Sequence, residues 1–140
     1  MPPALTPSLA LEYVHELSAD VHAGVVLDAA GELLAGPPAL AGPARALLSA
    51  GSDAGELEAA TADGVVCAVR TTAHAAVAIC GRFAIPGVVR EDLRAALDAL
   101  EGRPPNAAPT SSRPLDDGAE SALGAAADRL ISAVQRHSGA

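Results

Sequence analysis

The sequence predicts an α+β fold: a single five-stranded antiparallel sheet with helices on its faces, in the order α-ββ-α-βββ-α. Two observations carry this prediction. Short apolar runs flank a four-residue segment that begins with Asp28 and ends with Gly31, and a similar segment ends with Gly64. In both, we expect a turn whose glycine takes the left-handed conformation and closes a hairpin with a bulge. An Ala- and Leu-rich helix separates the two hairpins.

The first half of the chain supplies two helices and one hairpin. Thr6 or Ser8 can cap the N-terminal helix, and Pro7 suits its first turn. The predicted apolar face of that helix consists of Leu9, Tyr13, Val14 and Leu17. Residues 25–27 and 32–35 form the first hairpin. The second helix runs to about Ala50 and ends at Gly51, and Pro43 either begins it or bends it.

The next segment supplies three strands and a helix. Residues 56–61 are expected to be an edge strand, and 72–74 the loop of the last hairpin. The predicted register gathers the branched residues Val65, Val69, Val77 and Ile79 on one face, together with Cys67. It places Cys80 on the other face, so we expect no disulfide. The third helix buries Val89, Leu93, Ala96, Leu97 and Leu100.

Composition divides the chain into a domain at 1–101, a flexible linker at 102–118 and a C-terminal amphipathic helix at 119–137. The linker is rich in proline and polar residues. The apolar stripe of the last helix consists of Leu123, Ala127, Leu130, Ile131 and Val134. An isolated helix of this length is marginal in water. We therefore expect it to dock on its own domain, on a second copy or on a partner, as a structural or a regulatory element.

Charge and composition exclude several classes of function. The net charge is −8, lysine is absent, and Tyr13 and Phe83 are the only aromatic residues. Such a chain lacks the cations and stacking surfaces of a nucleic-acid-binding protein. No apolar run is long enough to span a membrane, and the N-terminus does not resemble a signal peptide. We expect a cytoplasmic protein with reduced cysteines.

The residue pattern predicts no catalytic site, cofactor or metal. The four histidines, His15, His22, His74 and His137, lack the spacing of a metal site and are expected to be mostly exposed. Neither cysteine has a base nearby in the predicted fold. A chain without lysine cannot hold a P-loop. Arg82, Arg90 and Arg94 could form a small basic patch, although a solvated face is the simpler interpretation.

The order of elements, with the Asp-x-x-Gly hairpin, resembles the roadblock/LC7 family, which has a profilin-like fold. The match runs from about Leu9 to Leu100 and includes residues 9–17, 23–35, 63–66 and 76–79. The resemblance implies a non-enzymatic scaffold that dimerises, with the third strands of two copies paired across a two-fold axis and the second helix alongside. Bacterial members commonly act beside small Ras-like GTPases as regulators.

Two classes of function follow. The first is a homodimeric interaction module that binds a GTPase or another signalling partner. Its dimer interface would consist of Leu47, Leu48, Leu57, Ala59 and Thr61. Partner binding would involve the stripe residues Leu123, Leu130, Ile131 and Val134. The alternative is a small-molecule-binding sensor on a profilin-like sheet, which the scarcity of aromatic residues disfavours.

Overall fold

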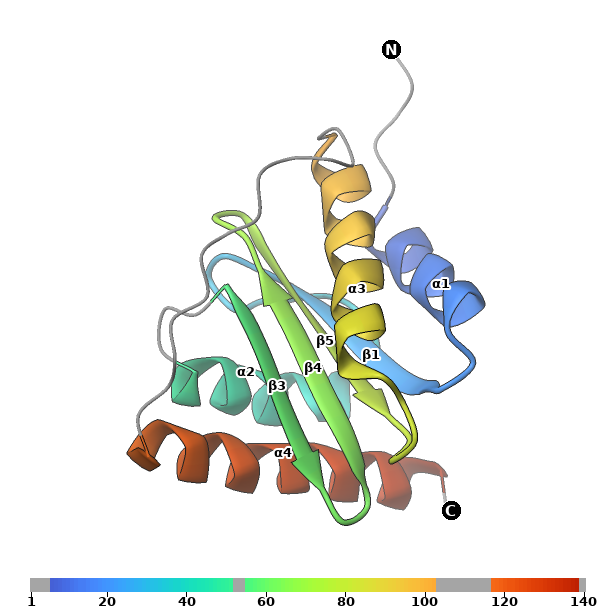
Figure 1. Ribbon diagram of the computed structural model, residues 1–140. Helices are drawn as coiled ribbons and strands as arrows, with labels where there is room; N and C mark the ends of the chain where they lie inside the picture. Colours follow the sequence, from blue (N-terminus) through green and yellow to red (C-terminus); the bar gives the residue numbers. More distant parts are fainter. Residues whose placement is uncertain (1–5, 52–54, 103–116, 139–140) are drawn as a thin grey trace.

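The computed structural model describes residues 6–51, 55–102 and 117–138, and these confirm the predicted fold class. Five antiparallel strands form one sheet in the order β2-β1-β5-β4-β3 (Figure 1). The strands are β1 (Val21–Asp28), β2 (Leu33–Ala35), β3 (Glu56–Thr61), β4 (Gly64–Arg70) and β5 (His74–Cys80). The helices are α1 (Pro7–Leu17), α2 (Ala41–Ala50), α3 (Pro86–Glu101) and α4 (Asp117–Ser138), and a short 3-10 turn, Pro38–Leu40, precedes α2.

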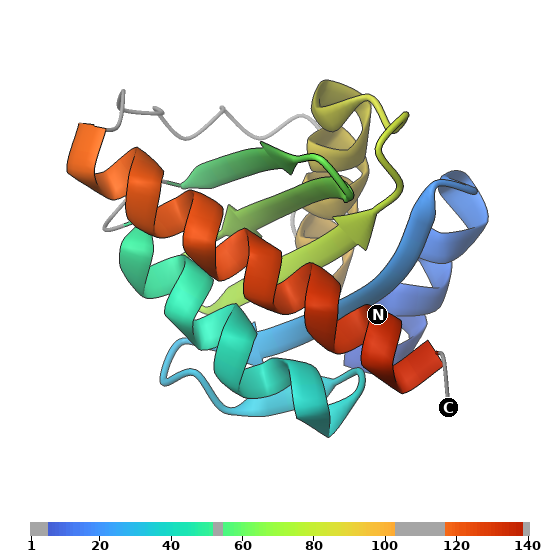
Figure 2. The same ribbon diagram turned by 90° about the horizontal axis from the view of Figure 1, so that it is seen from below.

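Helices cover both faces of the sheet. α1 and α3 lie on one face, and α2 and α4 lie side by side on the other (Figures 1 and 2). Side chains alternate along each strand, so the sheet contributes to two separate cores. The core under α2 and α4 includes Leu27, Val66 and Val77. The core under α1 and α3 includes Val26 and Cys67.

The first hairpin has the predicted turn. Gly31 has φ +88°, and its N–H donates to the carbonyl of Asp28 at 3.0 Å. The Asp28 carboxylate also accepts the backbone N–H groups of Ala30 and Glu32, each at 2.9 Å. The prediction was wrong for Gly64, which is not among the described glycines with positive φ. Glycine is required there for space, because a Cβ would lie 2.5 Å from the carbonyl oxygen of Cys80.

The predicted register of the last hairpin was wrong by one residue. The loop is 71–73, and Cys67 pairs with Ala78, Val66 with Ile79, and Val65 with Cys80. Both cysteines therefore lie on the α1/α3 face. The rule that branched residues gather on the buried face fails because this sheet has two buried faces. With apolar side chains required on both, the pattern does not distinguish one register from the next.

The predicted face of α1 was also wrong in part. Thr6 is the cap, since its Oγ1 accepts the N–H of Leu9 at 3.2 Å. Val14 is buried as predicted, but its buried neighbour is Ala10, whereas Leu9, Tyr13 and Leu17 are 39–49% exposed. Small side chains allow the helix to lie close to the sheet, so only a narrow strip of α1 is covered.

The second helix accommodates Pro43 without a break. Pro43 is the third residue of α2, in the first turn, where a proline removes no hydrogen bond within the helix. Gly51 ends the helix as predicted, although its φ is −81° rather than left-handed. A Cβ there would lie 2.3 Å from Cδ1 of Leu57. Gly51 therefore lets the end of α2 approach β3.

The C-terminal helix docks on its own domain. α4 lies against α2 and crosses β3 and β4 (Figure 2). Ala127, Leu130 and Ile131 of the predicted stripe are buried, and Val134 packs against the same core. The side chain of Leu123, and residues 103–116 of the predicted linker, lie outside the described part of the chain.

Candidate functional site

The exposed long edge of the sheet is the strongest candidate for an interaction site. β3 pairs with β4 along its whole length, and no other strand pairs with it within the described residues. The N–H of Arg70 donates to the carbonyl of Gly55 at 2.7 Å. Because hydrogen-bonding residues alternate along an antiparallel strand, the backbone groups of Glu56, Glu58 and Ala60 point toward the open side. These groups could pair with another strand.

The predicted dimer residues lie on the α2/α4 side of this edge, and most of them are buried within the single chain. Leu57 and Ala59 share that face, as predicted. However, Leu47, Leu48 and Leu57 are buried in the core of the single chain, under α4. Among the five predicted residues, only Ala59 and Thr61 are partly exposed. The sequence pattern could not reveal this, because it did not determine where the C-terminal helix docks.

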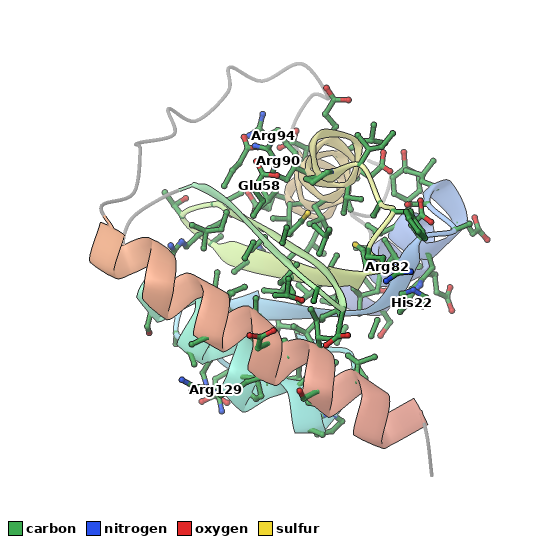
Figure 3. All side chains as sticks on the ribbon, turned by 60° about the horizontal axis from the view of Figure 1, so that its bottom comes forward. His22, Glu58, Arg82, Arg90, Arg94 and Arg129 are labelled. Atoms are coloured by element: carbon green, nitrogen blue, oxygen red, sulfur yellow. The ribbon has the colours of Figure 1, made fainter. Side chains whose placement is uncertain are left out.

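The α1/α3 side of the edge carries a row of ion pairs. Arg90 of α3 contacts Glu56 at 3.1 Å and Glu58 at 3.6 Å, and Arg94 also pairs with Glu56. Figure 3 shows Glu58 beside these two arginines. The predicted basic patch is therefore absent at Arg90 and Arg94, whose charges are matched by glutamates from β3. Glu58 is half exposed and remains accessible at the edge.

The apolar stripe of α4 is occupied by the domain. Leu130 is fully buried and Ile131 is 5% exposed, both in the core that also contains Leu47 and Leu57. A partner could reach these two side chains only if α4 moved away from the sheet. Asp128 and Arg129 face outward, as expected for the polar side of the helix.

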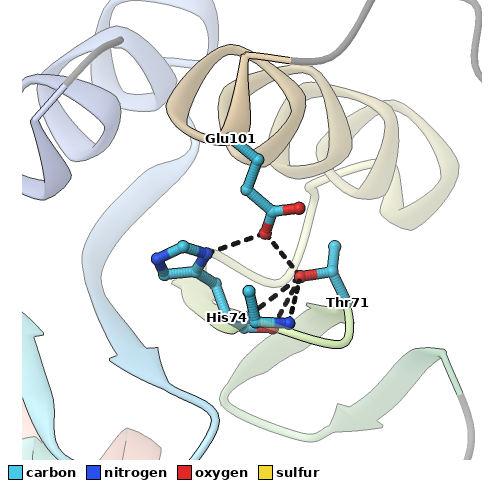
Figure 4. A network of polar contacts seen from close by, with 4 residues as sticks. Thr71, His74 and Glu101 are labelled. Atoms are coloured by element: carbon cyan, nitrogen blue, oxygen red, sulfur yellow. Dashed lines mark hydrogen bonds and ion pairs between the residues drawn. The ribbon is translucent and has the colours of Figure 1, made fainter.

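A polar network that sequence reasoning missed joins the β4–β5 turn to the end of α3 (Figure 4). The Glu101 carboxylate accepts the Thr71 hydroxyl at 2.5 Å and contacts Nδ1 of His74 at 2.8 Å. The Thr71 oxygen in turn accepts the N–H of His74 at 3.0 Å. His74 is therefore half-buried and paired, rather than a freely exposed histidine. Glu101 lies 27 positions from His74 and 30 from Thr71 in sequence, so no local pattern could have placed it beside them.

The two cysteines are free and buried in the same core, under α1 and α3. Interaction with the Cys80 side chain, together with burial, raises the pKa of Cys67 strongly above its usual value. Interaction with Cys67 lowers the pKa of Cys80. The Cys67 thiol also lies 3.9 Å from the carbonyl oxygen of Pro86. Both side chains are at most 2% exposed, so the pair has the environment of core residues rather than of an accessible nucleophile.

The remaining candidates lie apart from one another. His15 and His22 are exposed, and the side chain of His137 is outside the described residues. Within the described ranges, no three His, Cys, Asp or Glu side chains come together as metal ligands. Arg82 lies over the ring of Phe83 at 5.1 Å, at the opposite end of β5 from His74. Nor does any helix in those ranges have the length and apolarity that crossing a membrane requires.

Comparison with solved structures shows a distant structural likeness. No protein-family model and no curated protein matches the chain. A solved structure described as "MglB with tetrameric arrangement" is similar at 20% sequence identity and a TM-score of 0.47. The alignment covers 71% of this chain and 94% of that one.

Proposed function

We propose that this chain is a non-enzymatic interaction module that forms a homodimer through β3 and, as a dimer, binds a signalling partner. The open backbone edge of β3 carries the proposal. The open backbone groups of an edge strand can pair with another chain. Proteins either protect such an edge, with a covering segment or charged side chains, or use it to bind a partner. Here the edge runs over six residues without proline. Pairing with a second copy across a two-fold axis would satisfy its backbone groups.

The side chains on both faces of β3 are compatible with such pairing. On one face, Leu57 and Ala59 would continue an apolar layer from one copy to the next. On the other face, Glu58 is half exposed and only loosely paired with Arg90, at 3.6 Å. In an antiparallel pair of β3 strands, Glu58 would approach the second copy, where Arg90 and Arg94 flank the edge. Leu47 and Leu48 would contribute indirectly, by holding α2 against β3.

A small Ras-like GTPase is the partner implied by the roadblock/LC7 resemblance. That proposal rests on the order of elements from α1 to α3, which matches the family order. The position of α4 bears on where a partner could bind. Because α4 covers the side of α2 that faces β3, a partner would bind either beside α4 or after displacing it. The complete burial of Leu130 favours a permanent packing role for α4 over reversible docking.

A proline in β3 tests the dimer. The N–H of Ala60 points toward the open edge, so Ala60→Pro removes no hydrogen bond to β4 but blocks strand pairing with a second copy. We expect light scattering at micromolar concentration to give a dimer for the unmodified chain and a folded monomer for this variant. Circular dichroism checks that the variant is folded.

The matched control is Ala29→Pro, at the second position of the β1–β2 turn. Proline is favoured at that position of a type I turn. β1 and β2 lie at the far side of the sheet from β3, so this variant should remain dimeric. An unmodified chain that stays monomeric at high concentration, or a folded Ala60→Pro variant that remains a dimer, would refute the shared edge.

The partner is tested separately, by capture from native lysate on the unmodified chain. We expect mass spectrometry to identify a small GTPase bound to the unmodified chain. Failure to enrich any GTPase would contradict the partner assignment while leaving the dimer intact.

A further inference from the structure

The large apolar side chains that remain exposed gather on one face of the molecule. Seven such side chains occur within the described residues, and six of them lie on α1 or on the segment that leads from β5 into α3. These six, which we call the α1/α3 patch, are Leu9, Tyr13, Leu17, Phe83, Ile85 and Val88. The seventh, Leu34, lies on β2. Both aromatic residues of the chain, Tyr13 and Phe83, therefore belong to this patch and not to the core.

The two segments that carry the patch lie next to each other. α1 and α3 are in contact on the same face of the sheet (Figure 1). The N–H of Gly81 donates to the carbonyl of Asp20 at 2.9 Å, which holds the loop after β5 against the loop after α1. Ala84 is buried in the core that also contains Val14 of α1. Its two neighbours in sequence, Phe83 and Ile85, are 81% and 65% exposed, so this loop presents its large side chains to solvent beside α1.

The exposed apolar side chains of α1 lie on the side of the helix that faces α3. Leu9, Tyr13 and Leu17 are four residues apart, so they form a row along the helix. Leu11 lies on the opposite side of the helix and lines a hollow with Gly36, which follows the outer strand β2. The row therefore points away from β2 and toward α3. It extends over about 12 Å, at about 1.5 Å per residue, which is roughly two turns of a helix.

Acidic side chains border the α1/α3 patch. The exposed carboxylates on or next to its two segments are Glu12, Glu16, Asp20 and Glu91. The arginines of residues 7–20 and 81–92 are Arg82, which lies 5.1 Å from the centre of the Phe83 ring, and Arg90, which pairs with glutamates of β3. The border is therefore negative. This charge disfavours the same surface of a second copy and an anionic membrane as occupants of the patch.

We propose that the α1/α3 patch binds a cationic amphipathic helix of a partner protein, whose apolar stripe is bordered by Arg or Lys. Aromatic residues are frequent anchors of protein interfaces, and this chain exposes both of its own on one face. A helix presents apolar side chains at i, i+3, i+4 and i+7 to a surface of this kind. Its cations would meet the acidic border of the patch. The interaction goes beyond the proposed function, because it uses the face opposite α2 and α4 and requires neither the β3 dimer nor a GTPase.

A synthetic peptide probes this surface in the full chain. It has leucine and lysine at helical spacing over about 18 residues, with one tryptophan in the apolar stripe. The protein contains no tryptophan, so fluorescence of the peptide reports binding. We expect saturable binding at about 0.15 M salt, which weakens as the salt concentration rises. Phe83→Ala should weaken it about tenfold, as expected for truncation of an interface anchor. Because Phe83 is so exposed, this variant should fold, and circular dichroism checks that it does.

Leu34→Ala is the matched control, because Leu34 is exposed to the same extent as Tyr13 but lies outside the patch. It should change the affinity by less than about twofold. A peptide with glutamate in place of lysine tests the charge and should bind at least about tenfold more weakly. The absence of saturable binding, equal weakening by Phe83→Ala and Leu34→Ala, or equal affinity for the two peptides would overturn the proposal.

Two further measurements distinguish other occupants of the patch. In light scattering, Phe83→Ala should have the same mass as the unmodified chain, whether that mass is of a monomer or a dimer. A lower mass for the variant would mean that the patch joins two copies of this chain. The unmodified chain should not sediment with phosphatidylcholine vesicles. Sedimentation that Phe83→Ala abolishes would mean that the patch contacts lipid, and either of these results would overturn the assignment to a partner helix.

Discussion

Replacing Leu130 by Ala tests whether α4 is an integral part of the fold. Leu130 is fully buried between α4 and the core formed by α2 and the sheet. The substitution removes three carbon atoms from a site that contains Leu47, Leu57 and Ile131. If α4 unfolds together with the domain, the whole cost of this cavity should appear in the global stability.

The magnitude follows from burial. Transfer of three methylene-sized groups to water costs roughly 2.4 kcal/mol, at about 0.8 kcal/mol each. The cavity left behind adds to this, and fully buried Leu→Ala changes cost about 2–5 kcal/mol. We therefore expect a loss of about 3 kcal/mol in the free energy of unfolding.

Urea unfolding followed by circular dichroism, at one fixed protein concentration, measures this loss. With a dependence of about 2 kcal/mol per molar urea, the midpoint should fall by about 1.5 M. Leu9→Ala is the matched control, because Leu9 is 49% exposed on α1. Its midpoint should fall by less than about 0.5 M, since little apolar area is lost.

Two results would refute this reasoning. An unchanged midpoint for Leu130→Ala would mean that α4 contributes nothing to the stability of the domain. A separate early transition, with the main transition unaltered, would mean that α4 detaches on its own. Either result would favour the regulatory interpretation, in which a partner takes the place of the helix.

Three further predictions concern stability, pH and thiol chemistry. Gly36→Ala should destabilise the fold by more than about 2 kcal/mol in urea unfolding, because Gly36 has φ +107° and a Cβ would lie 2.4 Å from the carbonyl oxygen of Gly24. Burial raises the pKa of Asp92 above its ordinary value of 3.8. Ionisation of this carboxyl group as the pH rises therefore lowers the stability of the fold. Asp92→Asn should therefore raise the urea midpoint at pH 7, and the gain should vanish below about pH 3; a gain that persists there would contradict this cause. Cys67 and Cys80 should react slowly with a thiol reagent in the native protein and yield two thiols after denaturation; fewer than two would indicate oxidation.

Sequence patterns predicted the helices and turns well where the structure depends on residues close together in the chain. The turn at Asp28 and Gly31 requires a short side chain that accepts backbone hydrogens and a residue that tolerates positive φ, and both are visible in sequence. The apolar face of α3 was also predicted correctly, since Val89, Leu93 and Leu97 follow helical spacing and are buried.

Features that depend on long-range packing could not be predicted in the same way. The one-residue error in the β4–β5 register arose because helices cover both faces of the sheet. The pairing of Arg90 and Arg94 with Glu56 joins α3 to an edge strand more than 30 positions earlier. In each case the tertiary arrangement, not the local sequence, determines the neighbours.

The mass of the unmodified chain in solution tests the central claim most directly. Light scattering at micromolar concentration should give twice the chain mass of 13.8 kDa, and the folded Ala60→Pro variant should give the chain mass itself. A mass of 13.8 kDa for the unmodified chain at the highest attainable concentration would contradict the account, because the edge of β3 would then be open in solution.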